Sequence, residues 1–173
     1  MTTTQSIIIG IVEGLTEFLP VSSTGHMIIT EKILNIAEDD YSKMFTIAIQ
    51  LGAILAVVVL YWRKFFDFKN WKFYAKIAAG VVPALILGFL FSERIDSLLE
   101  SSTTVAVSLL LGGIVLLFID NVFKNPQIDK EEDISFFKAI MIGIWQCIAM
   151  IPGVSRSAAA IIGGIQQKLT RSA

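Results

Sequence analysis

The chain alternates long apolar runs with short polar segments, which is typical of a protein that crosses a membrane several times. Three runs are long enough to span a bilayer as helices, because each residue adds about 1.5 Å against a hydrocarbon core of about 30 Å. The pattern predicts these helices at 44–62, at about 73–91 and at about 103–119, within a membrane segment covering 44–120.

A fourth apolar run, from Ile7 to Met27, has a different pattern. It carries two glutamates four residues apart, Glu13 and Glu17, and breaks at Pro20 before the polar sequence Ser-Ser-Thr-Gly-His. A charged residue inside a membrane helix costs about 2.5–3.5 kcal/mol on insertion scales. Because neither packing nor solubility requires these charges, the pattern predicts a functional site on a broken helix.

The composition is that of an integral membrane protein. Of 173 residues, 54% are hydrophobic and 17% are charged, and the mean hydropathy is +0.70, well above that of ordinary soluble domains. The net charge of -1 provides no basic surface, which excludes nucleic acid as a partner. Cys147 is the single cysteine, so neither an intramolecular disulfide nor a multi-cysteine metal site can form.

The distribution of basic residues predicts the orientation in the membrane. Lysine and arginine predominate between Arg63 and Lys72, where Asp67 is the single acidic residue, and cytoplasmic loops carry such an excess. We therefore expect this loop inside the cell and the loops before Met44 and Thr103 outside. The segment 121–138 then lies inside by alternation. The N-terminus lacks the positive stretch of a signal peptide, so we expect the first segment to be mature protein.

The chain also contains an internal repeat. A shift of 133 residues superposes two apolar segments that each break at a proline and continue with hydroxyl residues. The matched positions are 9–11 with 142–144, Glu13 with Gln146, Val21 with Val154, Ser22 with Ser155 and Thr24 with Ser157.

Three spans separate the two copies. If the copies at 1–36 and 136–170 are re-entrant hairpins, this odd number makes them enter the membrane from opposite faces. The sequence therefore predicts a single all-α integral membrane domain over 1–173 with an inverted-topology repeat, two re-entrant helix hairpins and three full transmembrane helices. Irregular backbone at that depth has to be buried or line a wet cavity, so we expect a polar cavity between the hairpins.

The polar residues after Pro20 suit an anion site. Any of Ser22, Ser23 and Thr24 can cap the following helix, which leaves two hydroxyl groups without that role. The free N–H groups of a helix start attract phosphate. His26 lies three residues after Ser23, above the same helix face, where an imidazole can act as acid or base beside a hydroxyl nucleophile.

The second copy adds a permanent cation, Arg156, whose planar guanidinium suits bidentate contact with phosphate. Glu13 and Glu17 cannot both stay ionised without a partner, so a divalent cation, Arg156 or a retained proton has to compensate. Carboxylates are ligands that hard cations prefer, which makes these two residues the expected metal ligands. We expect the phosphate contacts at Ser22, Thr24, Gly25, Gln146, Gly153, Ser155, Arg156 and Ser157.

The chain resembles the bacterial undecaprenyl pyrophosphate phosphatases, the bacitracin-resistance family, on three motifs: EGLTEFLPVSSTGH at 13–26, QLGA at 50–53 and PGVSRS at 152–157. The resemblance implies hydrolysis of the polyprenyl pyrophosphate carrier of cell-wall synthesis to the monophosphate and phosphate. It also implies a multi-pass protein of the bacterial plasma (inner) membrane, with its active site facing the outside, and a divalent cation, Mg²⁺ or Ca²⁺. The catalytic residues that it implies are Glu13, Glu17, Ser23, His26 and Arg156, with His26 as the acid/base partner of Ser23 or as an alternative nucleophile.

Two departures from the family pattern matter. Ala160 stands where the second motif usually has a hydroxyl residue, and Ala158 where glycine is frequent, so a phosphate contact or a close helix approach is expected to be missing. Family members also resemble one another in having three further spans after the second broken segment. We expect either a fragment, a natural truncation, or a second half supplied by another chain, as in a homodimer.

Two other functions are also compatible with the sequence. Inverted repeats with broken helices and midplane carboxylates also describe transporters, so a membrane transporter or lipid flippase is the alternative. Ser23, His26 and Arg156 together favour hydrolysis, because proton-coupled transport would need the glutamates but not the serine. An inactive fragment that serves as an interaction module is the third reading.

Overall fold

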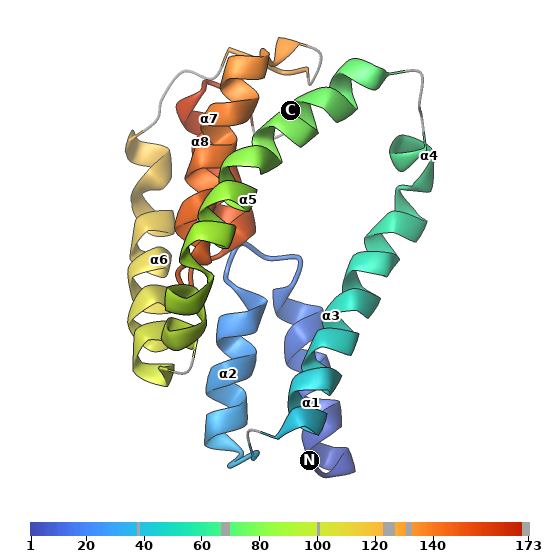
Figure 1. Ribbon diagram of the computed structural model, residues 1–173, viewed down its shortest axis with the longest axis vertical. Helices are drawn as coiled ribbons and strands as arrows, with labels where there is room; N and C mark the ends of the chain where they lie inside the picture. Colours follow the sequence, from blue (N-terminus) through green and yellow to red (C-terminus); the bar gives the residue numbers. More distant parts are fainter. Residues whose placement is uncertain (38, 67–69, 100, 123–126, 131–132, 171–173) are drawn as a thin grey trace.

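The computed structural model describes residues 1–37, 39–66, 70–99, 101–122, 127–130 and 133–170, and these are helical over most of their length (Figure 1). The helices are α1 (Thr3–Thr16), α2 (Ser23–Ile33), α3 (Asp40–Leu60), α4 (Trp62–Phe65), α5 (Trp71–Leu99), α6 (Ser102–Val122), α7 (Phe136–Cys147), the 3-10 helix η2 (Ile148–Met150) and α8 (Arg156–Gln166). The all-α fold that the sequence predicts is therefore confirmed for the described residues.

The three predicted spans correspond to α3, α5 and α6. By length and composition, the segments that can cross a membrane are Asp40–Leu60, Trp71–Ile95 and Ser102–Ile119. Almost none of the residues in these spans is fully buried within the described chain, as expected of helices that also meet lipid. Helix α5 is kinked at Phe91, whose φ of -117° and ψ of 15° are not helical, and a second helical stretch beyond the kink carries it past the predicted end to Leu99.

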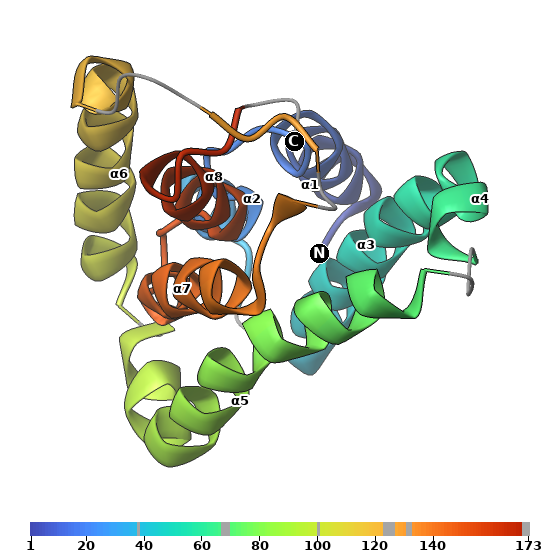
Figure 2. The ribbon, with the colours of Figure 1, turned by 90° about the horizontal axis from the view of Figure 1, so that it is seen from above.

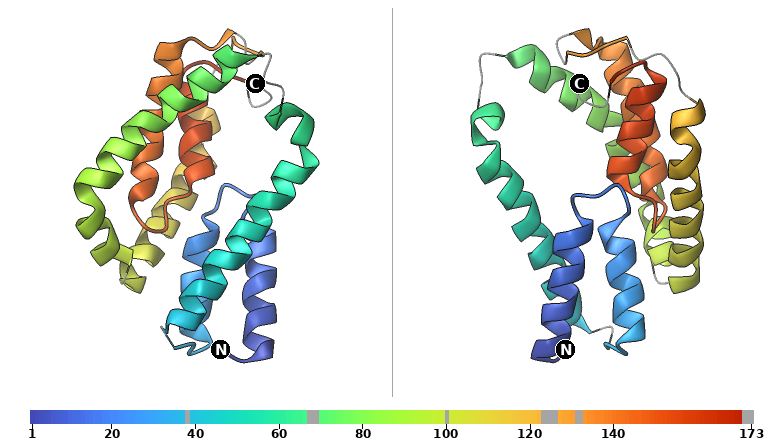
Figure 3. Two further views of the ribbon diagram at one scale, coloured as in Figure 1. Left: turned by 45° about the vertical axis from the view of Figure 1, so that its right-hand side comes forward. Right: turned by 180° about the vertical axis from the view of Figure 1, so that it is seen from behind.

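Each broken segment forms a hairpin of two short helices, α1 with α2 and α7 with α8 (Figure 3). The helices α7 and α8 begin at Phe136 and Arg156, each 133 residues after the starts of α1 and α2 at Thr3 and Ser23. Serine caps both second helices, Ser22 before α2 and Ser155 before α8. The repeat read from the sequence thus coincides with a repeat of helix boundaries, while the orientation of each hairpin in the membrane stays a prediction.

The two hairpins point their tips toward each other from opposite ends of the molecule (Figures 1 and 3). Both tips contact the same part of α6. A Cβ added to Gly25 would lie 3.1 Å from the side chain of Leu109, and one added to Gly153 would lie 2.5 Å from the carbonyl oxygen of Val105. Because these contacts fall within about one turn of α6, that helix holds the starts of α2 and α8 next to each other.

The second hairpin is fixed by a close crossing of α5 and α7. A Cβ built on Gly143 would lie 2.0 Å from the carbonyl oxygen of Gly80, and one built on Gly80 would lie 3.1 Å from the carbonyl oxygen of Ala139. Helices approach this closely only where small residues leave room for the backbones, as is common in membranes. Seen from above, α7 lies against α5 and α8 lies over α2 (Figure 2).

We expect Gly143→Ala to destabilise the protein by about 1–3 kcal/mol, because its methyl group has to force α5 and α7 apart. The matched control is Gly10→Ala at the repeat-equivalent position of α1, where no atom of the described residues lies within 4 Å of the added Cβ. There the substitution should be neutral or stabilise by about 0.5–1 kcal/mol, since alanine is the better helix former. Thermal unfolding in detergent measures both, and similar effects of the two substitutions would contradict the close crossing.

Candidate functional site

The first hairpin gathers the predicted acidic and hydroxyl residues at its tip. Helix α1 ends at Thr16, so Glu17 begins the irregular segment that leads through Pro20 to the start of α2. The hydroxyl of Ser23, the first residue of α2, donates a hydrogen bond to the carboxylate of Glu17. A carboxylate that accepts the proton of a hydroxyl group is placed to act as its base.

Glu13 lies one turn earlier on α1, beside Glu17 and Ser23. Its side chain is 1% exposed, and neither carboxylate oxygen has a hydrogen-bond partner within the part of the chain that the structure describes. A buried carboxylate without partners is costly, and natural proteins accept that cost mainly where a ligand or function requires it. Its free oxygens and the neighbouring Glu17 fit a divalent cation, which prefers carboxylate ligands.

Protein ligands for such a cation are few. Among the described residues, no group of three or more His, Cys, Asp or Glu side chains could hold a metal ion. The two glutamates therefore leave most of the coordination positions to other oxygen donors. Magnesium commonly binds in this way, through one or two carboxylates together with substrate phosphates and water.

His26 is half-buried and lies near the start of α2. Its Nδ1 is 2.9 Å from the carbonyl oxygen of Ser22, and a carbonyl oxygen can only accept a hydrogen bond. Nδ1 therefore carries the proton, and in the neutral ring Nε2 keeps its lone pair. The Ser23 hydroxyl bonds to Glu17 and the His26 ring to the Ser22 carbonyl oxygen, so the serine and the imidazole do not form a direct pair in the part of the chain that the structure describes.

Ser22 holds this geometry through an unusual backbone conformation. Its φ of 63° lies in the left-handed region, which residues other than glycine adopt rarely. In this conformation the Ser22 hydroxyl accepts from the N–H of Gly25 at 3.4 Å, and its carbonyl oxygen also accepts from the backbone N–H of His26 at 3.1 Å. Ser22 is therefore the cap of α2, and Ser23 and Thr24 keep their hydroxyl groups for other contacts.

The second hairpin presents a similar helix start. Ser155 caps α8 by accepting from the N–H of Ala158 at 3.2 Å, and its hydroxyl lies 2.9 Å from that of Ser157. Arg156 is the first residue of α8 and is exposed. In the described residues, no hydrogen bond or ion pair joins Arg156 to Glu13 or Glu17. The structure thus brings the two helix starts together but does not pair the arginine with the glutamates.

The remaining predicted residues differ in how closely the rest of the chain packs around them. Gly25 and Gly153 lie against α6, where a side chain would crowd that helix, and Gly153 also has a φ of 90°. Packing and backbone conformation therefore explain why both residues are glycine. Ala158 is buried, which leaves little room for a larger residue there. Gln146, the repeat partner of Glu13, is half-buried on α7.

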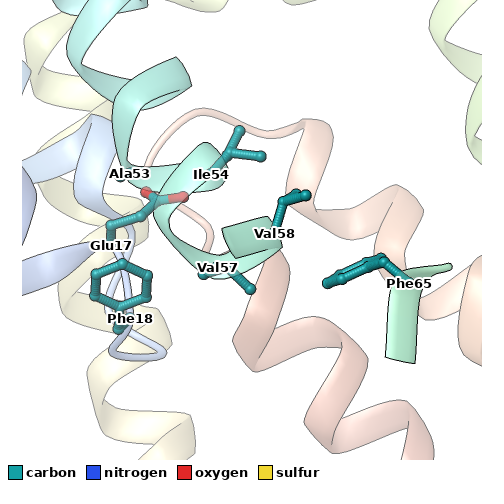
Figure 4. Close-up of a pocket in the computed structure, with 7 residues that line it drawn as sticks. All are labelled: Glu17, Phe18, Ala53, Ile54, Val57, Val58 and Phe65. Atoms are coloured by element: carbon teal, nitrogen blue, oxygen red, sulfur yellow. The ribbon is translucent and has the colours of Figure 1, made fainter. Parts of the chain in front are cut away.

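An apolar groove of about 300 Å³ begins at Glu17 and extends along α3 toward α4 (Figure 4). Apart from the glutamate, its lining is apolar and consists of Phe18, Ala53, Ile54, Val57, Val58 and Phe65. The apolar pattern at 44–62 predicted a membrane span and did not indicate this groove. The spacing of the four α3 residues, which share one helix face, is the signal that could have indicated it.

Gln50 makes a second contact that the sequence did not predict. It lies on α3 and donates from Nε2 to the Thr24 hydroxyl at 3.0 Å. Its sequence signal was visible, because Gln50 is the one amide or charged side chain between Met44 and Leu60.

Comparison with known proteins identifies the family. The model of the family described as bacitracin resistance protein BacA matches residues 6–173. A protein of Flavobacterium psychrophilum named undecaprenyl-diphosphatase is 58% identical over 168 residues, covering 97% of this chain and 62% of its own. Relatives of the same name from Flavobacterium johnsoniae and Porphyromonas gingivalis are 54% and 48% identical, with 99% and 100% of this chain and 64% and 67% of theirs covered.

The chain thus spans 62–64% of the length of the two Flavobacterium relatives. The match nevertheless runs from the first hairpin to the end of the second, through all the residues that form the two helix starts. The chain therefore belongs to the bacitracin resistance protein BacA family.

Proposed function

We propose that this protein hydrolyses a polyprenyl pyrophosphate, undecaprenyl pyrophosphate in the cell, to the monophosphate and inorganic phosphate. The observation that carries the proposal is the Ser23–Glu17 hydrogen bond at a helix N-terminus, beside the buried carboxylate of Glu13. Three relatives named undecaprenyl-diphosphatase share 48–58% identity with the chain and support the same substrate.

The pyrophosphate is proposed to lie between the starts of α2 and α8. Both helix N-termini direct unpaired N–H groups and positive potential toward this place, which stabilises phosphate oxygens. Arg156, with its exposed guanidinium, would contact the terminal phosphate, and the hydroxyls of Thr24 and Ser157 would donate to its oxygens.

The proposed reaction has two steps. The Ser23 oxygen attacks the terminal phosphorus while Glu17 takes its proton, and the bond to the bridging oxygen breaks to release the polyprenyl monophosphate. Water then attacks the phosphoserine with its proton passing to Nε2 of His26, and the proton held by Glu17 returns to Ser23 as phosphate leaves. Positioning and charge stabilisation provide most of the acceleration in such transfers.

A divalent cation, Mg²⁺ or Ca²⁺, is proposed at Glu13 and Glu17, where it would neutralise charge on the phosphate oxygens. The unpartnered oxygens of Glu13 support this site.

The three apolar spans are those of a protein that lies in a membrane. We propose that this is the bacterial inner membrane and that the site opens to the outside of the cell. Two copies of the chain are proposed to associate, and the molar mass of the protein in detergent tests this association.

The decisive experiment measures two activities of the unmutated protein in liposomes. Phosphate release from a polyprenyl pyrophosphate reports hydrolysis, and movement of a labelled lipid between leaflets reports the flippase alternative. The proposal requires phosphate release that depends on a divalent cation. Lipid movement without any phosphate release would overturn it in favour of transport.

The groove along α3 is proposed to hold the part of the polyprenyl tail next to the pyrophosphate, because it starts at Glu17 and is otherwise apolar. We expect Val58→Trp, which fills the groove, to raise KM for a long polyprenyl pyrophosphate about tenfold, equivalent to about 1.4 kcal/mol. KM for a short, water-soluble prenyl pyrophosphate should not change.

The matched control for the groove is Val59→Trp. Val59 is the next residue of α3, is 73% exposed and does not line the groove. An equal rise of KM for both variants, or for both substrates, would count against tail binding at this place.

A further inference from the structure

Gln50 places an amide in the middle of an apolar membrane helix. It is half-buried, and its Nε2 donates to the Thr24 hydroxyl at 3.0 Å, which links α3 to the start of α2. Polar side chains inside membrane spans are costly and commonly mark functional sites. Thr24 follows Ser23 directly in the first turn of α2, so this bond ends beside the proposed nucleophile.

The direction of the bond determines what Thr24 can do. An N–H group can only donate, so the Thr24 oxygen accepts from Gln50 and its own O–H remains available for a second partner. At a helix N-terminus that binds an anion, the natural acceptor for this O–H is a phosphate oxygen. Without Gln50, the hydroxyl group could turn and donate elsewhere.

We propose that Gln50 is a positioning residue that directs the Thr24 hydroxyl proton toward the substrate pyrophosphate. This inference rests on the proposed hydrolysis of a polyprenyl pyrophosphate and adds a residue from α3 to it. Gln50 also lies one turn before Ala53 and Ile54, which line the apolar groove. One face of α3 thus presents a polar group beside the phosphates and apolar groups beside the tail.

The substitution Gln50→Glu tests the direction of the hydrogen bond. An ionised carboxylate has nearly the shape of the amide but can only accept, so Thr24 would donate to it and lose its phosphate contact. We expect kcat/KM for phosphate release to fall about 10–100-fold, the range for a hydrogen bond to a charged group. Gln50→Leu should cost about tenfold, since it removes the orienting partner without adding an acceptor.

The pH profile separates positioning from a structural role. At low pH the introduced carboxyl group becomes protonated and can donate to Thr24, so the activity of Gln50→Glu should rise relative to Gln50→Leu measured at the same pH. Comparison of the two variants at each pH cancels the pH dependence that the rest of the site gives to both. A loss that came only from altered packing would not recover on acidification.

A double-mutant cycle and a control complete the test. Thr24→Val combined with Gln50→Leu should cost no more than the larger single loss, because both remove the same contact. The control Gln5→Leu deletes an amide that bonds the Leu34 carbonyl oxygen at 3.1 Å, at the end of the hairpin away from the tip, and should keep full activity. The role of Gln50 would be overturned if the losses of activity added in the double mutant and if the ratio of the Gln50→Glu activity to the Gln50→Leu activity did not change with pH. An unmutated protein without activity would instead overturn the proposed function itself.

Discussion

Replacing Ser23 with alanine is expected to lower phosphate release from a polyprenyl pyrophosphate about 10³-fold with little change in KM. The reason is that the Ser23 hydroxyl already donates to Glu17 and stands at the N-terminus of α2. Removing a nucleophile that has its base in place removes the chemical step, while the helix ends and Arg156 still bind the phosphates. The measurement is kcat and KM for phosphate release in liposomes.

Ser6→Ala is the matched control for this prediction. Ser6 lies on α1, and its hydroxyl donates to the carbonyl oxygen of Thr2 at 3.1 Å, so the same chemical change there removes a local bond away from the tip. Its activity should equal that of the unmutated protein. If Ser23→Ala kept a tenth or more of the activity while His26→Ala had none, the nucleophile would be the Nε2 of His26 instead.

Replacing Glu13 with glutamine is expected to have two opposite effects. Without a divalent cation, the variant should be more stable than the unmutated protein by about 1 kcal/mol or more, because a buried carboxylate without hydrogen bonds is replaced by a neutral amide. Phosphate release should nevertheless fall about 10²–10³-fold, because the proposed cation loses a ligand and its charge stabilisation.

Thermal unfolding in EDTA and in Mg²⁺, together with phosphate release, measures both effects. In the unmutated protein Mg²⁺ should raise the melting temperature, since a ligand that binds the folded state stabilises it, and in the Glu13→Gln variant this rise should be smaller. Glu17→Gln is the comparison, because Glu17 accepts a hydrogen bond from Ser23 and its replacement should not stabilise the protein in EDTA. A Glu13→Gln variant that is less stable than the unmutated protein in EDTA would refute the idea of an uncompensated charge.

The sequence predicted the parts of the fold that depend on local pattern. The apolar runs correctly located α3, α5 and α6, because the length and composition of a membrane helix are properties of the chain itself. The extension of α5 to Leu99 was missed, since its last turns are polar and carry no membrane signal.

Contacts between distant segments were less predictable. The repeat aligns Gly143 with Gly10 in sequence. Only the structure shows that Gly143 lies against the backbone of Gly80, while Gly10 has open space around it. Likewise, the spacing of Ser23 and His26 suggested a direct pair, whereas the turn at Ser22 brings Glu17 to the serine and the Ser22 carbonyl oxygen to the imidazole. Such partners depend on loop geometry, which residue spacing does not determine.

The bond between His26 and the Ser22 carbonyl oxygen also bears on how protons move. A histidine that relays protons through a membrane takes them on one ring nitrogen and gives them up from the other. In this protein the Nδ1–H of His26 donates to the Ser22 carbonyl oxygen, which also accepts the backbone N–H of His26. The ring therefore exchanges protons at Nε2 alone. A proton taken from water must leave on the side where it arrived, and phosphate release should therefore proceed at the same rate with or without a proton gradient across the bilayer.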